Sequence, residues 1–246
     1  MNNILLFSRK KAKARLLCFP HAGAGAISIK PLADNLPDWI EVASIRLPGR
    51  ESRFNEPLLT RFSEFRDDAL SSILELQTDK TPLFLLGQCS GATLAYGVAK
   101  SLVALPGTAV LGLIVVSSSN PTFLRHQMSG VNLRDLAEEA MNTGIPKEIL
   151  DVTEFSNIIL EQMEADYRLV FNTVSEVSSN PAPFPILEFR AVDDRLESPS
   201  RWEGFSTNWE TAVIPGKHLL IQENPRDLAT LTLRFIERLS DPQTNI

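Results

Sequence analysis

A cysteine between two closely spaced glycines is the first feature of this sequence that could perform chemistry. Gly87, Cys89 and Gly91 form the pattern Gly-x-Cys-x-Gly, after the apolar run Phe84–Leu86 and before the helix-compatible run Ala92–Val103. This pattern is typical of a nucleophile elbow, a sharp strand-to-helix turn that lifts one side chain clear of a sheet. Glycine suits both flanking positions because a side chain there would collide with the crossing strand and helix. We therefore expect Cys89 to be the nucleophile, where serine is usual.

Ser90 is the alternative nucleophile within the same motif. An elbow presents the central residue of the pattern, Cys89, so Ser90 is expected instead to give its backbone N–H to an oxyanion hole. The second donor is expected from the loop Phe19–Ala26, whose small residues let backbone approach a substrate closely. The N–H of His21 or Ala22 is the candidate there. The loop lacks the spacing and the lysine of a phosphate-binding P-loop.

A general base for the cysteine must come from three histidines, His21, His126 and His218. In an α/β-hydrolase the triad follows the chain order nucleophile, acid, histidine, with the histidine on a loop after the last strand. His218 fits this order and follows the strand-like run Trp209–Ile214. His21 precedes the nucleophile, and His126 lies in a helical region. We therefore predict His218 as the base.

The acid that orients this histidine should follow a strand between Cys89 and His218. The extended run Ile186–Val192 leads into Asp193 and Asp194. Adjacent carboxylates on an extended segment point to opposite sides, so only one of them is expected to reach the histidine. Its role would be to accept a hydrogen bond from the imidazole Nδ1, which fixes the tautomer and stabilises the imidazolium.

The elements that must position these residues alternate between apolar runs of strand length and amphipathic helical segments. This alternation predicts an α/β fold with a mostly parallel sheet flanked by helices, in one domain over residues 1–246. The expected strands are Arg15–Phe19, Glu41–Leu47, Leu83–Gly87, Leu111–Ser117, Ile186–Val192 and Trp209–Ile214. The expected helices are Ser28–Leu36, Arg61–Leu76, Ser90–Val103 and Arg226–Leu239.

The stretch of residues 120–180 interrupts this alternation. It shows three helical patterns, Asn132–Met141, Lys147–Asp151 and Glu154–Val174, of which the last is amphipathic. Helices inserted between two core strands are typical of a lid over the strand ends, where open α/β sheets bind ligands. Ordinary crossover helices are the alternative, and we favour the lid.

Composition narrows the class of partner. The 246 residues are 43% hydrophobic and 22% charged, with a net charge of −6. This mild acidity argues against nucleic acid as a partner. The longest apolar stretches are too short to span a bilayer, so no membrane association is expected.

The N-terminal segment and the cysteines bear on the compartment. An apolar start precedes the basic run of residues 9–15, the reverse of a signal peptide, so a cytoplasmic protein with a solvated basic terminus is expected. A reducing compartment disfavours a disulfide between the two cysteines, Cys18 and Cys89. No metal is expected, because no cysteine–histidine cluster has ligand spacing.

Four separated motifs extend over nearly the whole chain. They are Cys-Phe-Pro-His-Ala-Gly at residues 18–23, Arg-Leu-Pro-Gly-Arg-Glu-Ser-Arg at 46–53, the elbow at 87–91, and Gly-Lys-His at 216–218. In these motifs and their order the chain resembles the stand-alone (type II) thioesterases of polyketide and nonribosomal peptide assembly lines. The Leu-Pro-Gly-Arg-Glu segment is the most specific of the four, since an elbow alone is a weak signal.

The resemblance implies an α/β-hydrolase fold with a helical lid. It also implies hydrolysis of acyl groups from the phosphopantetheine thiol of acyl or peptidyl carrier proteins, with no cofactor of the enzyme's own. In the family the triad aspartate is followed by a short turn and, further on, a tryptophan-containing segment. Asp194 with Trp202 downstream is similar, which favours Asp194 over Asp193. We expect a monomer.

Docking of a carrier protein should involve basic side chains, since carriers are generally acidic. Arg125, Arg134 and Lys147, beside the expected lid, are candidates for this contact.

Three residues depart from the family pattern. Gln88 and Cys89 replace the usual histidine and serine of the elbow, and Lys217 stands where glycine is more usual. With cysteine the acyl-enzyme is itself a thioester, open to attack by water, by another pantetheine thiol or by an amine. Cysteine is also the better nucleophile, especially beside a histidine that lowers its pKa.

Three functions therefore follow from the sequence. The first is hydrolysis of acyl or aminoacyl carrier thioesters through an acyl-Cys89 intermediate. The second is transfer of the acyl group between carriers or to an amine, and the third is non-catalytic carrier binding. The complete set Cys89, His218 and Asp194 argues against the third, and the match over the whole chain favours hydrolysis.

Overall fold

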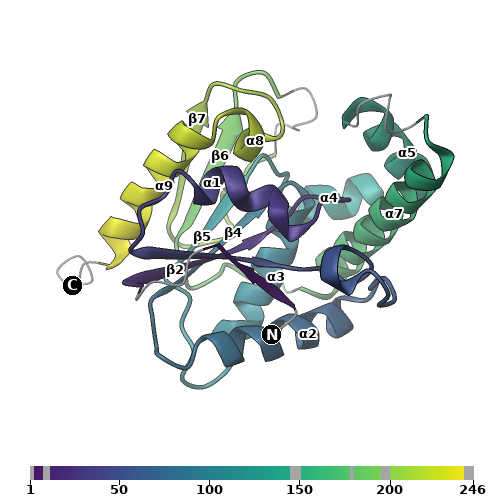
Figure 1. The fold of residues 1–246 in the computed structure, drawn as a ribbon. Coiled ribbons are helices and arrows are strands. Elements are labelled where there is room, and N and C mark those ends of the chain that lie inside the picture. The colour runs from purple at the N-terminus through teal and green to yellow at the C-terminus, as the bar shows by residue number, and fades with distance from the viewer. Residues whose placement is uncertain (1–2, 8–11, 145–150, 178–179, 195–199, 241–246) are drawn as a thin grey trace.

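A sheet of seven strands forms the centre of the computed structural model, which describes residues 3–7, 12–144, 151–177, 180–194 and 200–240. The strand order is β1-β3-β2-β4-β5-β6-β7 (Figure 1). Strand β1 runs antiparallel to β3, and every other neighbouring pair is parallel. The predicted mostly parallel sheet flanked by helices is confirmed.

The strands and helices have the following bounds. The strands are β1 Ile4–Leu6, β2 Ala14–Phe19, β3 Ile40–Ile45, β4 Leu83–Gln88, β5 Gly112–Val116, β6 Ile186–Ala191 and β7 Trp209–Ile214. The α-helices are α1 Lys30–Ala33, α2 Phe62–Leu76, α3 Ser90–Val103, α4 Pro121–Met128, α5 Leu133–Gly144, α7 Thr153–Glu176, α8 Leu220–Glu223 and α9 Pro225–Ser240. Two short 3-10 helices, η1 Ala26–Ile29 and η2 Glu51–Arg53, precede α1 and α2.

Alternating side chains of the strands supply two hydrophobic layers. In β2, Leu17 and Phe19 belong to the layer beneath α2 and α3, whereas Leu16 and Cys18 belong to the layer beneath α1, α8 and α9. Both sets are fully or almost fully buried. Such runs of apolar residues, buried on both faces, are what a parallel sheet between two helical layers requires.

A helical insertion joins β5 to β6. Its helices α4, α5 and α7 lie together, to one side of the helices that cover the sheet (Figure 1). The amphipathic pattern Glu154–Val174 is confirmed as α7, and Asn132–Met141 as part of α5. The predicted segment Lys147–Asp151 lies almost entirely outside the described residues.

Several elements differ from the sequence-based expectation. Strand β1 and helix α4 were not predicted, and the single helix predicted over Ser28–Leu36 is a 3-10 turn followed by the short α1. The solvated terminus was wrong for Arg15, whose side chain is only 4% exposed. It pairs with Glu41 of β3 and donates to Gln77 Oε1 at 2.7 Å. A strand that begins within a basic run can bury a charge where neighbouring elements supply acceptors.

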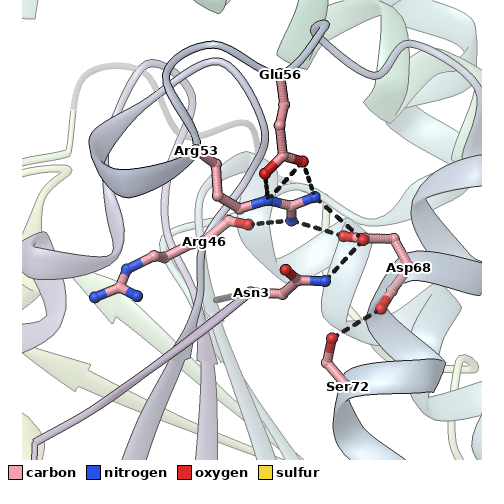
Figure 2. Close-up of polar contacts among 6 residues, drawn as sticks. All are labelled: Asn3, Arg46, Arg53, Glu56, Asp68 and Ser72. Carbon is pink, nitrogen blue, oxygen red and sulfur yellow. Dashed lines mark hydrogen bonds and ion pairs between the residues drawn. The ribbon is translucent and has the colours of Figure 1, made fainter. Parts of the chain in front are cut away.

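The segment of residues 46–53 that follows β3 is held by a second buried arginine, shown in Figure 2. Arg53 donates to the carbonyl oxygen of Arg46 at 2.8 Å and pairs with Asp68 of α2 at 2.8 Å. Glu56 binds the same guanidinium at 2.6 Å, and Asn3 donates to Asp68. This network ties the two ends of the segment, Arg46 and Arg53, to one another and to α2.

Candidate active site

The predicted site residues converge at the carboxyl ends of the parallel strands. Cys89 follows β4, His21 and Ala22 follow β2, Asp194 follows β6 and His218 follows β7. All of them line one cavity of about 1020 Å³. In α/β sheets this edge is where ligands bind.

Cys89 occupies a sharp turn between strand and helix. It is the single residue between β4 and α3, with φ 54° and ψ −123°, a strained conformation for a side-chain-bearing residue. A Cβ on Gly87 would lie 2.3 Å from the carbonyl oxygen of Gly91, and one on Gly91 would lie 2.2 Å from that of Phe19. Glycine is therefore required on both sides, and the turn is a nucleophile elbow in geometry.

His218 lies between Cys89 and Asp194. Its Nδ1 is 2.8 Å from Asp194 Oδ2, and its ring hydrogen-bonds the Cys89 sulfur. The Asp194 side chain is 1% exposed, so this hydrogen bond is shielded from water. Asp193 is exposed, and its backbone N–H donates to the Gly216 carbonyl oxygen at 3.0 Å. Of the two aspartates, Asp194 is the one that meets the histidine.

The cysteine and histidine shift each other's ionisation. Burial opposes the charged form of Cys89, but the charge and hydrogen bond of His218, aided by the Ser90 N–H, lower the pKa of this thiol. Burial likewise opposes a charged His218 ring, but the Cys89 thiolate and the hydrogen bond to Asp194 raise its pKa to about 10. The two shifts act in the same sense: each favours a thiolate on Cys89 beside a protonated His218, the arrangement that makes a thiol reactive.

Backbone N–H groups near Cys89 belong to Ser90 and to the loop after β2, whose residues 21–24 line the cavity. The Ser90 N–H, at the start of α3, donates to the Cys89 sulfur. In the loop after β2, the Gly23 N–H donates to Asp166 at 2.8 Å and the Ala24 N–H to the His21 carbonyl oxygen at 3.1 Å.

A family model described as a thioesterase domain matches residues 14–239. The chain belongs to the thioesterase family.

Curated relatives extend over almost the whole of this thioesterase. The gramicidin S biosynthesis protein GrsT of Aneurinibacillus migulanus is 27% identical, over 94% of this chain and 92% of its own. The human medium-chain S-acyl fatty acid synthase thioesterase is 26% identical, over 94% of this chain and 91% of its own.

Solved structures show the fold of this thioesterase to be that of the α/β-hydrolases. RedJ, a thioesterase from the prodiginine pathway of Streptomyces coelicolor, has a TM-score of 0.76 at 24% identity, covering 92% of this chain and 86% of its own. YbtT, a type II thioesterase from the yersiniabactin pathway, has a TM-score of 0.76 at 23% identity, covering 97% and 99%.

Gln88, which stands where the elbow usually has a histidine, is completely buried, and both atoms of its amide form hydrogen bonds. Its Oε1 accepts from the Ile221 N–H at 2.9 Å, and its Nε2 donates to Gln222 Oε1 at 3.0 Å. The Gln88 Nε2 also lies 3.4 Å from His21 Nδ1. Since the amide nitrogen can only donate, Nδ1 accepts, and the proton of the neutral His21 ring is on its own Nε2. Burial, together with the nearby His218, lowers the pKa of His21 to about 4, so that ring is neutral at physiological pH.

The insertion supplies an apolar wall of the cavity. Ile159, Met163 and Tyr167 of α7 and Ala140 of α5 line it, and the exposed Lys217 lies at its margin. Burial raises the pKa of Tyr167, with the nearby Cys89 adding to the effect, so its phenol stays protonated. Such a wall suits the hydrocarbon part of an acyl group, which carries no charge to satisfy.

Other candidates from the sequence lie away from this chemistry. His126 is exposed on α4 and does not line the cavity. Arg125 donates to the Val174 carbonyl oxygen at 2.8 Å, and Arg134 pairs with Glu164 at 3.2 Å. Lys147 lies outside the described residues.

Two residues that touch the site were missed by sequence reasoning. Asp166 of α7 and Arg50 of the segment after β3 form a buried ion pair against the loop after β2. Arg50 belongs to the most family-specific motif, which carried no assigned role. The motif singled out Arg50, but its partner Asp166 lies 116 residues further along the chain, so the sequence did not show what Arg50 binds.

Cys18 and Cys89 are both free thiols, with Cys18 buried in β2. In the described part of the chain, no cluster of His, Cys, Asp and Glu could hold a metal ion. Among the described helices, none is long and apolar enough to cross a bilayer.

Proposed function

We propose that this thioesterase hydrolyses acyl groups from the phosphopantetheine thiol of carrier proteins, through an acyl-Cys89 intermediate. The observation that carries the proposal is the array of Cys89, His218 and Asp194 beside an apolar-walled cavity. The relatives support the substrate class. One belongs to gramicidin S biosynthesis, another is a fatty acid synthase thioesterase, and a structural neighbour is a type II thioesterase of an NRPS/PKS pathway.

In the first step the Cys89 thiolate attacks the thioester carbonyl carbon. The negative charge that develops on the carbonyl oxygen is stabilised by the N–H of Ser90 and, from the loop after β2, that of Ala22 or His21. The Gly23 N–H is already engaged with Asp166, which leaves it unavailable for this role. As the carbon–sulfur bond to the carrier breaks, the departing pantetheine sulfur takes the proton of His218, and a neutral acyl-Cys89 thioester remains.

In the second step water replaces the carrier. Acylation removes the thiolate charge, the main influence that raises the pKa of His218 against the effect of burial. The ring, now neutral, accepts a proton from water, and Asp194 holds the ring in orientation through Nδ1. The water oxygen forms the bond to the acyl carbon, the bond to sulfur breaks, and the free acid leaves with the thiolate–imidazolium pair restored.

Acyl transfer is the second candidate function, and the cysteine itself favours it. The acyl-Cys89 thioester has nearly the same energy as the carrier thioester, so a second pantetheine thiol could replace water as the acceptor. An amine could do the same. The histidine–aspartate pair would serve either acceptor equally, since both must lose a proton.

The deciding experiment mixes the protein with an acylated carrier and an empty second carrier, and follows both by intact mass. Hydrolysis predicts free acid, an emptied first carrier and no acyl signal on the second. Acyl signal on the second carrier would refute simple hydrolysis. Cys89→Ala, as the control, should leave the first carrier acylated. An acylated carrier untouched by the wild-type protein would refute both functions.

A further inference from the structure

Arg50 and Asp166 form a buried bidentate ion pair. The Nη1–Oδ2 distance is 2.8 Å and the Nη2–Oδ1 distance is 2.9 Å. The side chains are 5% and 4% exposed. A buried ion pair of this kind contributes little net stability, because desolvation of both charges offsets their attraction. Its more general use is to fix geometry, through the directional fork of the guanidinium.

The same pair forms hydrogen bonds to the backbone of the loop after β2. Asp166 Oδ2 accepts from the Gly23 N–H at 2.8 Å, and Arg50 Nη1 donates to the Ala24 carbonyl oxygen at 3.1 Å. The peptide plane between Ala22 and Gly23 is thereby oriented, since a peptide unit is rigid. The preceding residue, Ala22, carries one of the two candidate N–H donors of this loop for the oxyanion.

Helix α7 is tied to this arrangement in two further places. Gln162 Nε2 donates to the Gly49 carbonyl oxygen at 2.8 Å, directly before Arg50. Met163 covers Gly23 so closely that a Cβ there would lie 2.7 Å from Met163 Cγ. The helix that forms the apolar wall, the family-specific motif and the loop after β2 therefore meet at a single contact.

We infer that Arg50 and Asp166 are positioning residues for the reaction. They hold the loop after β2 so that the Ala22 N–H meets the developing oxyanion, and they couple this geometry to the placement of α7 over the cavity. The inference rests on the proposed function, since it concerns the transition state of thioester cleavage. A donor misplaced by about 1 Å can lower the rate by about 100-fold.

A matched control lies in the same segment of the chain. Arg53 pairs with Asp68 at 2.8 Å, and Arg53 is 4% exposed (Figure 2). The other groups that bind the Arg53 guanidinium are Glu56 and the Arg46 carbonyl oxygen, and neither these residues nor Asp68 line the cavity. Asp68→Asn therefore removes a carboxylate from a buried arginine as Asp166→Asn does, without touching the loop after β2.

The test compares Asp166→Asn with Asp68→Asn in hydrolysis of an octanoyl-pantetheine thioester, with iodoacetamide alkylation of Cys89 as the second readout. Asp166→Asn should lower kcat about 10- to 100-fold with KM changed by less than about threefold. Its alkylation rate should stay within about twofold of wild type, because alkylation needs the thiolate and develops no oxyanion. Asp68→Asn should leave kcat within about twofold of wild type while lowering the thermal midpoint.

Wild-type kcat in folded Asp166→Asn would overturn the inference, and so would a parallel loss of alkylation. If circular dichroism finds Asp166→Asn unfolded, Arg50→Lys replaces it. Lysine keeps the charge but not the fork, and the same fall in kcat with unchanged alkylation is expected. A wild-type protein that fails to cleave the thioester would refute the proposed function and the inference with it. Wild-type turnover matched by the variant would refute the inference alone.

Discussion

Replacing His218 by glutamine tests whether the histidine is what ionises Cys89. In the wild-type protein the charge and hydrogen bond of His218 lower the pKa of the thiol although burial opposes it. Glutamine keeps a hydrogen-bonding side chain but carries no charge. Burial then dominates, and the pKa of Cys89 should rise to the ordinary thiol value or above.

The expected size of the change follows from that shift. A thiol of ordinary pKa is about 3% ionised at pH 7, so loss of the pair lowers the thiolate population about 30-fold relative to a fully ionised site. The alkylation rate at one pH falls by less, because a thiolate of higher pKa is intrinsically more nucleophilic. The ultraviolet absorbance of the thiolate and the shape of the pH profile are therefore the better measures.

The assay records iodoacetamide alkylation and thiolate absorbance from about pH 5 to pH 10. In wild type the signal should be flat around neutrality and fall only as acid protonates the thiolate, whose pKa lies below the ordinary value. It should change again as His218 loses its proton near pH 10. In His218→Gln the signal should climb about tenfold per pH unit through neutrality.

His126→Gln is the matched control, since this histidine is exposed on α4 and outside the cavity. It should reproduce the wild-type profile. Superimposable profiles for wild type and His218→Gln would refute the ion pair and with it the assignment of His218 as the base.

Four further substitutions test the surrounding geometry. Asp194→Asn should lower kcat by about 10³- to 10⁴-fold through loss of the correct tautomer, and Asp193→Asn should not; equal effects would contradict the placement of the acid. Gly91→Ala should destabilise the fold by about 1–3 kcal/mol in urea unfolding, because the added Cβ would lie 2.2 Å from the Phe19 carbonyl oxygen. Gln88→Ala should lower the free energy of unfolding by about 1–3 kcal/mol in the same measurement, since the buried Ile221 N–H loses its acceptor. Unchanged stability would contradict the close packing at Gly91 or the hydrogen bond of Gln88, according to the variant.

Local chemistry explains why the elbow could be predicted from the sequence. A side chain at Gly87 would meet the backbone of Gly91 and Ala92, and one at Gly91 would meet the backbone of Phe19 in the neighbouring strand. Both glycines belong to one tight strand-to-helix turn, so the requirement leaves a short motif. The inner parallel strands β2 to β6 were predictable because they are buried on both faces and appear as apolar runs, whereas the edge strand β7 is mostly exposed or half-buried. His218 could be predicted because few histidines were available and the chain order of the triad is restrictive.

Elements whose stability depends on partners far along the chain were missed. Strand β1 has three residues and pairs only at the sheet edge with β3, so it shows no long apolar run. Helix α4 begins at Pro121 and has only eight residues, half of them polar, which gives little periodic signal. The Arg50–Asp166 pair joins residues 116 positions apart, and no local pattern records such a contact. The choice of Asp194 over Asp193 needed the family pattern, because alternation alone leaves both open.

The central claim, an acyl group carried on Cys89, is tested most directly by trapping it. The protein is mixed with excess acylated carrier, quenched in acid and digested, and the peptide that contains residues 87–91 is weighed by mass spectrometry. The account predicts one acyl addition on Cys89, labile to neutral hydroxylamine as a thioester is, and none in Cys89→Ala. An acyl group on Ser90, or full hydrolysis by Cys89→Ala, would contradict it.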